Sequence, residues 1–189
     1  MQTAAASPPQ ITGSINTKQI AKDLLNENLN ATFVDAADIA ENQVANGTVI
    51  SGNLGLVQGY LVYNTTVANI NSNTAYNVIV DPSNARVLAT SQGMPLGTVG
   101  GQGGKEFLNS GNVTATLVDA AAIAEGQFAS GMAIAGSFEV MEGKPVYSIT
   151  VVEVNNEMLF KVIVDPSTGN VLTTSEGTRV GDLGIKGVF

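Results

Sequence analysis

The run Val78-Ile-Val-Asp-Pro-Ser83 returns as Val162-Ile-Val-Asp-Pro-Ser167, 84 residues further along a chain of 189 residues. The same shift places residues 32–93 on residues 116–177 without a gap, and 30 of the 62 aligned positions are identical. Self-similarity of this kind at a fixed interval indicates two copies of one structural unit. We therefore predict that both stretches have one fold and loops of similar length.

Each copy opens with the pattern of an amphipathic helix. Thr32 and Thr116 suit the N-cap position, and an aspartate three residues later completes a capping box near the positive end of the helix dipole. Gly47 and Gly131 are predicted to end the two helices. The apolar stripe has helical spacing in both copies, with Phe33, Ala36, Ala37, Ala40 and Val44 in the first and Leu117, Ala120, Ala121, Ala124 and Phe128 in the second.

Four strand-like runs follow each helix, and in the first copy they lie at about residues 49–57, 60–70, 75–81 and 86–91. Gln58-Gly59 suits a tight hairpin turn, and Asp81-Pro82 opens another turn. Strands that short turns connect in sequence must pair antiparallel. The predicted fold class is α+β, with two tandem units that each place one helix on an antiparallel meander.

The repeat divides the chain into five predicted segments. An additional helix, capped by Asn16, is expected to precede the first copy. The segments are an extended N-terminal segment at residues 1–15, repeat 1 with its preceding helix at 16–93, a glycine-rich linker at 94–104, repeat 2 at 105–177, and an extended tail at 178–189.

The composition argues against catalysis. The chain has no His, Cys or Trp, which excludes Ser-His-Asp triads, cysteine nucleophiles and Cys/His zinc sites. We therefore expect no catalytic residue, no cofactor and no metal site. Sixteen acidic and eight basic residues give a net charge of −8, so nucleic acid is a poor partner. Apolar runs are far shorter than the roughly 20 residues of a membrane helix, so no membrane span is expected.

Two groups of acids have both a structural and a metal-binding interpretation. Asp35, Asp38 and Glu41 are candidate calcium ligands, but capping and a solvated helix face explain them more simply. Asp81 and Asp165 precede proline, and a role in the turn accounts for them fully. Tyr63 and Tyr147 are expected to pack on a sheet face.

Three motifs in order resemble the PepSY domain: the alanine-rich helix, the glycine turn followed by Val-Tyr, and the hydrophobic strand that ends in Asp-Pro-Ser-Thr-Gly-Asn-Val-Leu. Their best matches are residues 120–125, 143–147 and 162–172, and the first copy departs from the pattern at Asn84-Ala85. PepSY domains occur in propeptides of secreted metallopeptidases and in cell-envelope proteins. The resemblance implies a non-catalytic extracytoplasmic module with a secreted peptidase as a candidate partner. Acidic, Asn- and Thr-rich chains with paired domains of this kind also resemble archaeal proteins.

The chain ends suggest self-assembly. Gly97, Gly100 and Gly103 in the linker have equivalents in the tail, which has no third copy to reach. The leading hypothesis is a non-enzymatic extracellular structural protein that assembles head-to-tail into a filament or surface fibre. The alternative is a PepSY-type module that binds and inhibits a secreted peptidase. The predicted docking residues are Leu183, Ile185, Val188 and Phe189 in the tail and Ile11 and Ile15 in the N-terminal segment.

Four Asn-x-Ser/Thr sequons favour an extracellular location. The first residues lack the basic and apolar regions of an intact signal peptide. We expect that one has already been removed, and the alternative is that Met1 is an ordinary start. The glycosylation candidates are Asn30, Asn46, Asn64 and Asn112.

Overall fold

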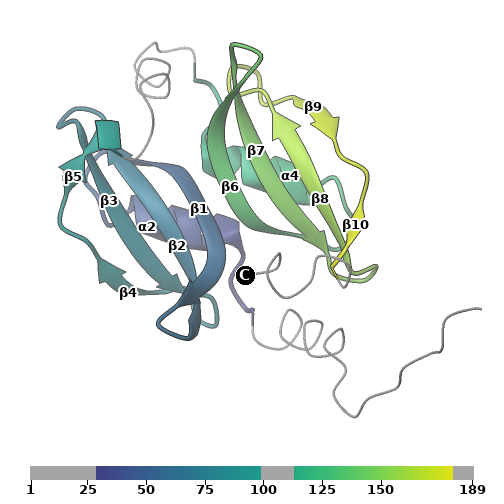
Figure 1. Cartoon of the computed structure of the whole chain (residues 1–189), viewed down its shortest axis with the longest axis horizontal. Coiled ribbons are helices and arrows are strands. Elements are labelled where there is room, and N and C mark those ends of the chain that lie inside the picture. Colours follow the sequence, from purple (N-terminus) through teal and green to yellow (C-terminus); the bar gives the residue numbers. More distant parts are fainter. Residues whose placement is uncertain (1–28, 99–112, 181–189) are drawn as a thin grey trace, which may run out of the picture.

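The computed structural model describes residues 29–98 and 113–180, which we call repeat 1 and repeat 2 (Figure 1). Each repeat consists of one α-helix and a four-stranded meander, followed by a short additional strand. The elements of repeat 1 are α2 (Phe33–Glu41), β1 (Gly47–Val57), β2 (Tyr60–Asn69), β3 (Thr74–Asp81), β4 (Arg86–Thr90), β5 (Met94–Pro95) and the 3-10 helix η2 (Leu96–Thr98). Those of repeat 2 are α4 (Leu117–Glu125), β6 (Gly131–Met141), β7 (Lys144–Glu153), β8 (Met158–Val164), β9 (Val171–Thr174) and β10 (Thr178–Arg179).

The predicted meander is confirmed. β1 to β4 differ from the predicted strands by at most two residues at either end. In the first hairpin turn Gln58 and Gly59 have φ values of 52° and 85°, the combination that suits the twist of antiparallel strands. Both helices also have the predicted capping boxes, in which the Thr32 and Thr116 side chains accept from the backbone three residues later.

The predicted helix ends are wrong. α2 ends at Glu41 and α4 at Glu125, not at Gly47 and Gly131. The side chain of the last glutamate turns to the sheet, and Glu41 Oε1 accepts a hydrogen bond from the Val49 N–H at 2.7 Å. Gly47 instead begins β1, where a Cβ would come within 2.6 Å of a neighbouring valine side chain. These glycines therefore allow close packing between the turn and the sheet.

The two repeats join edge to edge in one antiparallel sheet. Its strand order is β10-β8-β7-β6-β1-β2-β3-β4, with β5 paired to β3 and β9 paired to β8. The joint between the repeats, which we call the seam, is the pairing of β1 with β6. The seam contains three residue pairs, Ser51 with Ser137, Gly52 with Gly136, and Asn53 with Ala135.

A local twofold axis passes through the seam. Gly52 and Gly136 lie 84 residues apart, so in this pair a position of repeat 1 faces its own equivalent in repeat 2. The repeats thus meet as the subunits of an isologous dimer do, although one chain provides both. The two predicted units are therefore halves of one continuous sheet.

Both helices pack on the same face of this sheet and contact each other, behind the strands in Figure 1. The alanines of the helical stripes are fully buried, as the pattern predicts. Phe33 is fully buried at the seam, where a Cβ on Gly52 or Gly136 would come within 2.7 Å or 2.9 Å of its ring. One core cluster therefore contains residues of both repeats.

A second, smaller core lies on the other face of repeat 1. It contains Ile50, Ala68, Ala75 and Leu96, with Met94 packed against it. The predicted linker, residues 94–104, therefore begins too early. β5 and η2 belong to repeat 1, because Leu96 is buried in this core and Met94 packs against it.

The start of the predicted tail has the equivalent place in repeat 2. β10 pairs with β8, and the Val180 N–H donates to the Glu157 carbonyl at 2.9 Å, as the Leu96 N–H does to the Asn73 carbonyl. Val180 is only 8% exposed.

The extended N-terminal segment, the helix expected from Asn16 and the rest of the linker and tail lie outside the described residues. No helix within the two described repeats has the length and apolar character needed to cross a bilayer.

The third turn provides a test of local strain. Ala85 has a φ of 58°, whereas its equivalent in repeat 2 is Gly169 with a φ of 72°. A residue with a Cβ pays about 1–2 kcal/mol for this left-handed conformation. We expect Ala85→Gly to raise the free energy of unfolding by about 1 kcal/mol, and the reciprocal Gly169→Ala to lower it by a similar amount. Urea unfolding of both variants measures this, and equal stability of all three proteins would contradict it.

Candidate functional site

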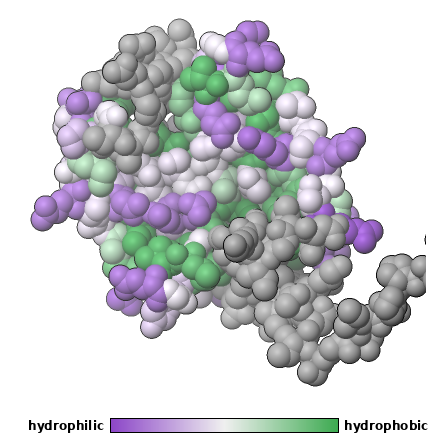
Figure 2. Space-filling model, viewed as in Figure 1, coloured by the Kyte–Doolittle hydropathy of each residue, from purple (hydrophilic) through white to green (hydrophobic). Residues whose placement is uncertain are grey.

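A polar depression crosses the seam on the face of the sheet that the helices leave open. Its volume is about 400 Å³, and its floor comes from both repeats. Figure 2 shows this face, where white and purple atoms occupy the centre of the sheet between apolar areas. We call this depression the seam trough. Its polar lining consists of Ser51, Asn53, Asn64, Thr66, Ser137, Glu139, Ser148, Thr150 and Lys161.

The strand register explains why these polar side chains lie together. In β1, Gly52 faces the helices, so Ser51 and Asn53 on either side of it face away from them. In β2 and β7, Tyr63 and Tyr147 belong to the main core, so the residues that follow them, Asn64 and Ser148, face the trough. Alternation along each strand thus separates the apolar helical face from an open face that is polar at the seam and apolar at the smaller core of repeat 1.

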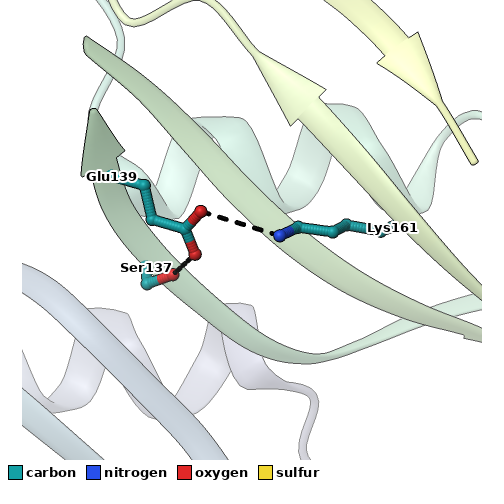
Figure 3. Close-up of polar contacts among 3 residues, drawn as sticks. All are labelled: Ser137, Glu139 and Lys161. Carbon is teal, nitrogen blue, oxygen red and sulfur yellow. Dashed lines mark hydrogen bonds and ion pairs between the residues drawn. The ribbon is translucent and has the colours of Figure 1, made fainter. Parts of the chain in front are cut away.

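One ion pair lies in the repeat 2 half of the trough. Lys161 Nζ lies 3.6 Å from Glu139 Oε2, and the Ser137 hydroxyl donates to Glu139 Oε1 at 2.9 Å (Figure 3). The lysine and glutamate side chains are 50% and 39% exposed, so water screens their attraction. Since the two charges compensate, the lining of the trough has no net charge.

Asn64 is the exceptional residue of the trough. Its Oδ1 atom is buried and has no hydrogen-bond partner, and among the buried side-chain polar atoms of the two described repeats it alone is in this state. A buried polar atom without a partner costs about 1–3 kcal/mol. Asn64 as a whole is half-buried and lines the trough, so rotation about its last side-chain bond would turn Oδ1 toward a ligand or ordered water.

On the helical face, the glutamate that ends each helix is partly buried near an aspartate of the other helix. Burial raises the pKa of Glu41, which the nearby Asp38 and Asp119 carboxylates raise further, whereas the hydrogen bond from Val49 lowers it. Burial likewise raises the pKa of Glu125, whose Oε1 accepts from the Ala133 N–H at 2.9 Å. These glutamates thus have a structural role at the helix ends.

The raised pKa values make stability dependent on pH. A glutamate with a folded pKa above its unfolded value of 4.5 binds its proton more tightly in the native state. Its contribution is therefore present at low pH and is lost as the pH rises from about 4.5 through the folded pKa. We expect Glu41→Gln, which keeps the acceptor for Val49, to reduce this loss. Urea unfolding at pH 4.5 and pH 7.5 measures the free energy of unfolding of both proteins. If the difference between the two pH values is the same in wild type and Glu41→Gln, this expectation is wrong.

Asp81 and Asp165 in the turns change the stability with pH in the direction opposite to that of the glutamates. Hydrogen bonds from Ser83 to Asp81, and from Ser167 to Asp165, lower the pKa of each carboxyl below 3.8. Asp81 Oδ1 accepts from the Ser83 N–H at 2.9 Å, as the turn interpretation predicts. Their stabilisation is present above pH 3.8 and is lost as the pH falls through the folded pKa.

The other predicted residues are distributed over the molecule. Asp35 is in the capping box of α2, and within the described part of the chain no three acidic, His or Cys residues are arranged to hold a metal ion. Tyr63 and Tyr147 are buried as predicted, the Tyr63 hydroxyl donates to the Ala31 carbonyl at 3.2 Å, and burial raises the pKa of Tyr147 to about 12.

The glycosylation candidates differ in their surroundings. Asn30 and Asn46 are exposed, whereas Asn64 lies in the trough with its carbonyl oxygen buried. Asn112 lies outside the described residues. So do all six predicted docking residues, Leu183, Ile185, Val188, Phe189, Ile11 and Ile15.

Sequence reasoning missed the seam trough. Its polar residues alternate with core residues along the strands, and that alternation was visible in the sequence. Which strand of repeat 1 pairs with which strand of repeat 2 was not, because the pairing depends on packing under the helices.

Comparison with known proteins identifies the second repeat. Residues 114–174 match the PepSY family, described as peptidase propeptide and YPEB domain, so a PepSY domain occupies this part of the chain. No curated protein matches the chain. The chain is also similar to the crystal structure of a "putative lipoprotein" from Clostridium difficile 630, with a TM-score of 0.43 and 19% identity over 82% of this chain and 98% of that one.

Proposed function

With a PepSY domain at residues 114–174 as the premise, we propose that the chain is a non-catalytic extracytoplasmic module that binds a secreted peptidase. The match to a propeptide domain is the observation that carries this proposal. The absence of His and Cys from the sequence supports a role in binding rather than catalysis.

The proposal includes repeat 1 as a second PepSY unit. It has 30 of 62 aligned residues in common with repeat 2, together with the same order of helix and strands. Since the two sheets are continuous, both repeats offer their open face to one partner. Two units in one continuous surface would contact more of a peptidase than one unit does.

The test uses a panel of purified secreted metallopeptidases. Each enzyme is mixed with the intact chain, hydrolysis of a fluorogenic peptide is followed, and the mixture is separated by size-exclusion chromatography. We expect at least one enzyme to be inhibited with 1:1 stoichiometry while the chain remains uncleaved. If the chain leaves every enzyme fully active and co-elutes with none, this proposal is wrong.

A second candidate is head-to-tail assembly into a filament. It is favoured by β10, which lies in repeat 2 where β5 lies in repeat 1, so the chain leaves both repeats from equivalent places. Lateral growth of the sheet is less favoured, because β4 and β9 have only five and four residues and each pairing contains a register shift.

Deletion of residues 181–189 tests this candidate. The deletion begins after Val180, because that residue is buried against its own repeat. Sedimentation and negative-stain microscopy should show assemblies of the intact chain and a monomer for the truncated one. A monomeric intact chain at high concentration excludes assembly through the tail, and so does undiminished assembly of the truncated chain.

A further inference from the structure

We propose that the seam trough binds an extended, uncharged segment of a polypeptide, and that the Asn64 amide contacts its main chain. This inference deepens the proposed function by naming the surface that a peptidase partner would use. The register of the sheet aligns small and polar side chains in two rows, each across five strands.

Two polar rows run perpendicular to the strands on the open face. The pairings of β3 with β2, β2 with β1, β1 with β6, β6 with β7 and β7 with β8 place the residues of each row side by side, about 4.8 Å apart. The first row is Asn77, Thr66, Ser51, Ser137 and Ser148, and the second is Asn64, Asn53, Ala135, Thr150 and Lys161. The first row ends at Ile163 on β8 and the second at Ile79 on β3. Between these ends, hydroxyl and amide groups extend over both repeats without a large apolar side chain.

The local twofold axis relates the two rows but does not make them chemically equal. Asn53 and Asn64, both in repeat 1, correspond to Ser137 and Ser148 in repeat 2. The repeat 1 half of the trough thus carries primary amides, whereas the repeat 2 half carries hydroxyls and the compensated pair of Glu139 and Lys161. A ligand therefore meets different groups in the two halves and has one preferred direction.

The chemistry of the lining selects the class of ligand. A primary amide offers one acceptor and two donors, which match the N–H and C=O of a peptide unit in either orientation of the amide. Rotation of the Asn64 amide would bring its unpartnered Oδ1 into the trough, where a main-chain N–H supplies a donor without bringing a charge. Because the charges of Glu139 and Lys161 compensate, the lining has no net charge that would favour a phosphate or a strongly cationic group.

The direct test is an NMR titration of the intact, ¹⁵N-labelled chain. The probe is a capped, neutral hexapeptide, Ac-Gly-Ser-Gly-Ser-Gly-Ser-NH₂, and the comparison ligands are inorganic phosphate and maltose. We expect the peptide to shift the Asn64 side-chain amide and the backbone amides of Ser51 and Ser137 in a saturable way. Phosphate or maltose shifting these resonances at lower concentration than the peptide would overturn the proposal.

Matched variants then test the role of Asn64. Asn64→Ser introduces the residue that repeat 2 has at the equivalent position, and it removes the unpartnered oxygen, so the fold should tolerate it. We expect it to weaken peptide binding at least fivefold. Asn71→Ser, in the exposed turn between β2 and β3, is the control and should bind as the wild type does. Equal binding by wild type and Asn64→Ser would overturn the proposal.

The same variants separate this inference from the proposed function. If a peptidase binds and Asn53→Arg in the trough leaves its affinity unchanged, the trough is not the contact surface, although the proposed function stands. If no peptidase binds but the peptide occupies the trough, the inference stands and the proposed function fails. Gln43→Arg, an exposed residue that follows α2, controls for the added charge.

Discussion

Replacement of Phe33 by alanine is expected to lower the free energy of unfolding by about 3–5 kcal/mol, the usual cost of removing a fully buried aromatic ring. The ring lies beside Gly52 and Gly136, so its loss leaves a cavity below the seam. Both repeats should therefore be destabilised together. Urea unfolding measures the loss, and hydrogen exchange of the amides in β2 and β7 shows how it is distributed.

Phe33→Leu is the matched control, because repeat 2 has Leu117 at the equivalent position. It retains most of the apolar contact and should cost clearly less than alanine does. If Phe33→Ala lowers protection only in β2 and leaves β7 unaffected, the ring does not connect the repeats. If its cost falls below that of Phe33→Leu, the assignment of the core is wrong.

Gly136→Val is expected to destabilise the protein by about 1–3 kcal/mol through overpacking. A Cβ at this position would lie 2.9 Å from the Phe33 ring, 3.1 Å from Ile149 Cδ1 and 3.2 Å from Leu117 Cδ1. A loss of stability is informative here, because valine in place of glycine usually stabilises a strand. Thermal or urea unfolding would detect the change.

The control for this variant is Ala135→Val on the same strand. Ala135 also belongs to the seam, but its side chain faces the open side of the sheet and lines the trough. We expect little change in stability from that substitution. Equal destabilisation by both variants would mean that the seam, and not the helical face, resists the larger side chain.

Together, these experiments separate the stability of the sheet from its use. Substitutions at Phe33 and Gly136 change the covered face, where packing under the helices maintains the pairing of β1 with β6. Asn53 and Asn64 act on the open face, where substitution should alter binding and leave the fold intact.

The sequence by itself determined the repeated unit. Capping boxes at Thr32 and Thr116, the small-residue helix stripe and the turn at Gln58-Gly59 are local signals, because neighbouring residues satisfy them. They predicted the helices, the meander and the α+β class. The helix ends were misjudged, because Glu41 and its counterpart turn to accept a strand N–H, which is a tertiary contact.

Only the tertiary structure decided how the two units combine. A seam of three residue pairs, centred on Gly52 and Gly136, depends on the fit of Phe33 between strands and helices, and no run of neighbouring residues encodes that fit. The seam trough follows from the same pairing, since Asn64 and Ser148 face one depression only when the sheets are continuous. The sequence contained these residues as the polar half of an alternating pattern, whereas their assembly into one surface required the long-range register of the sheet.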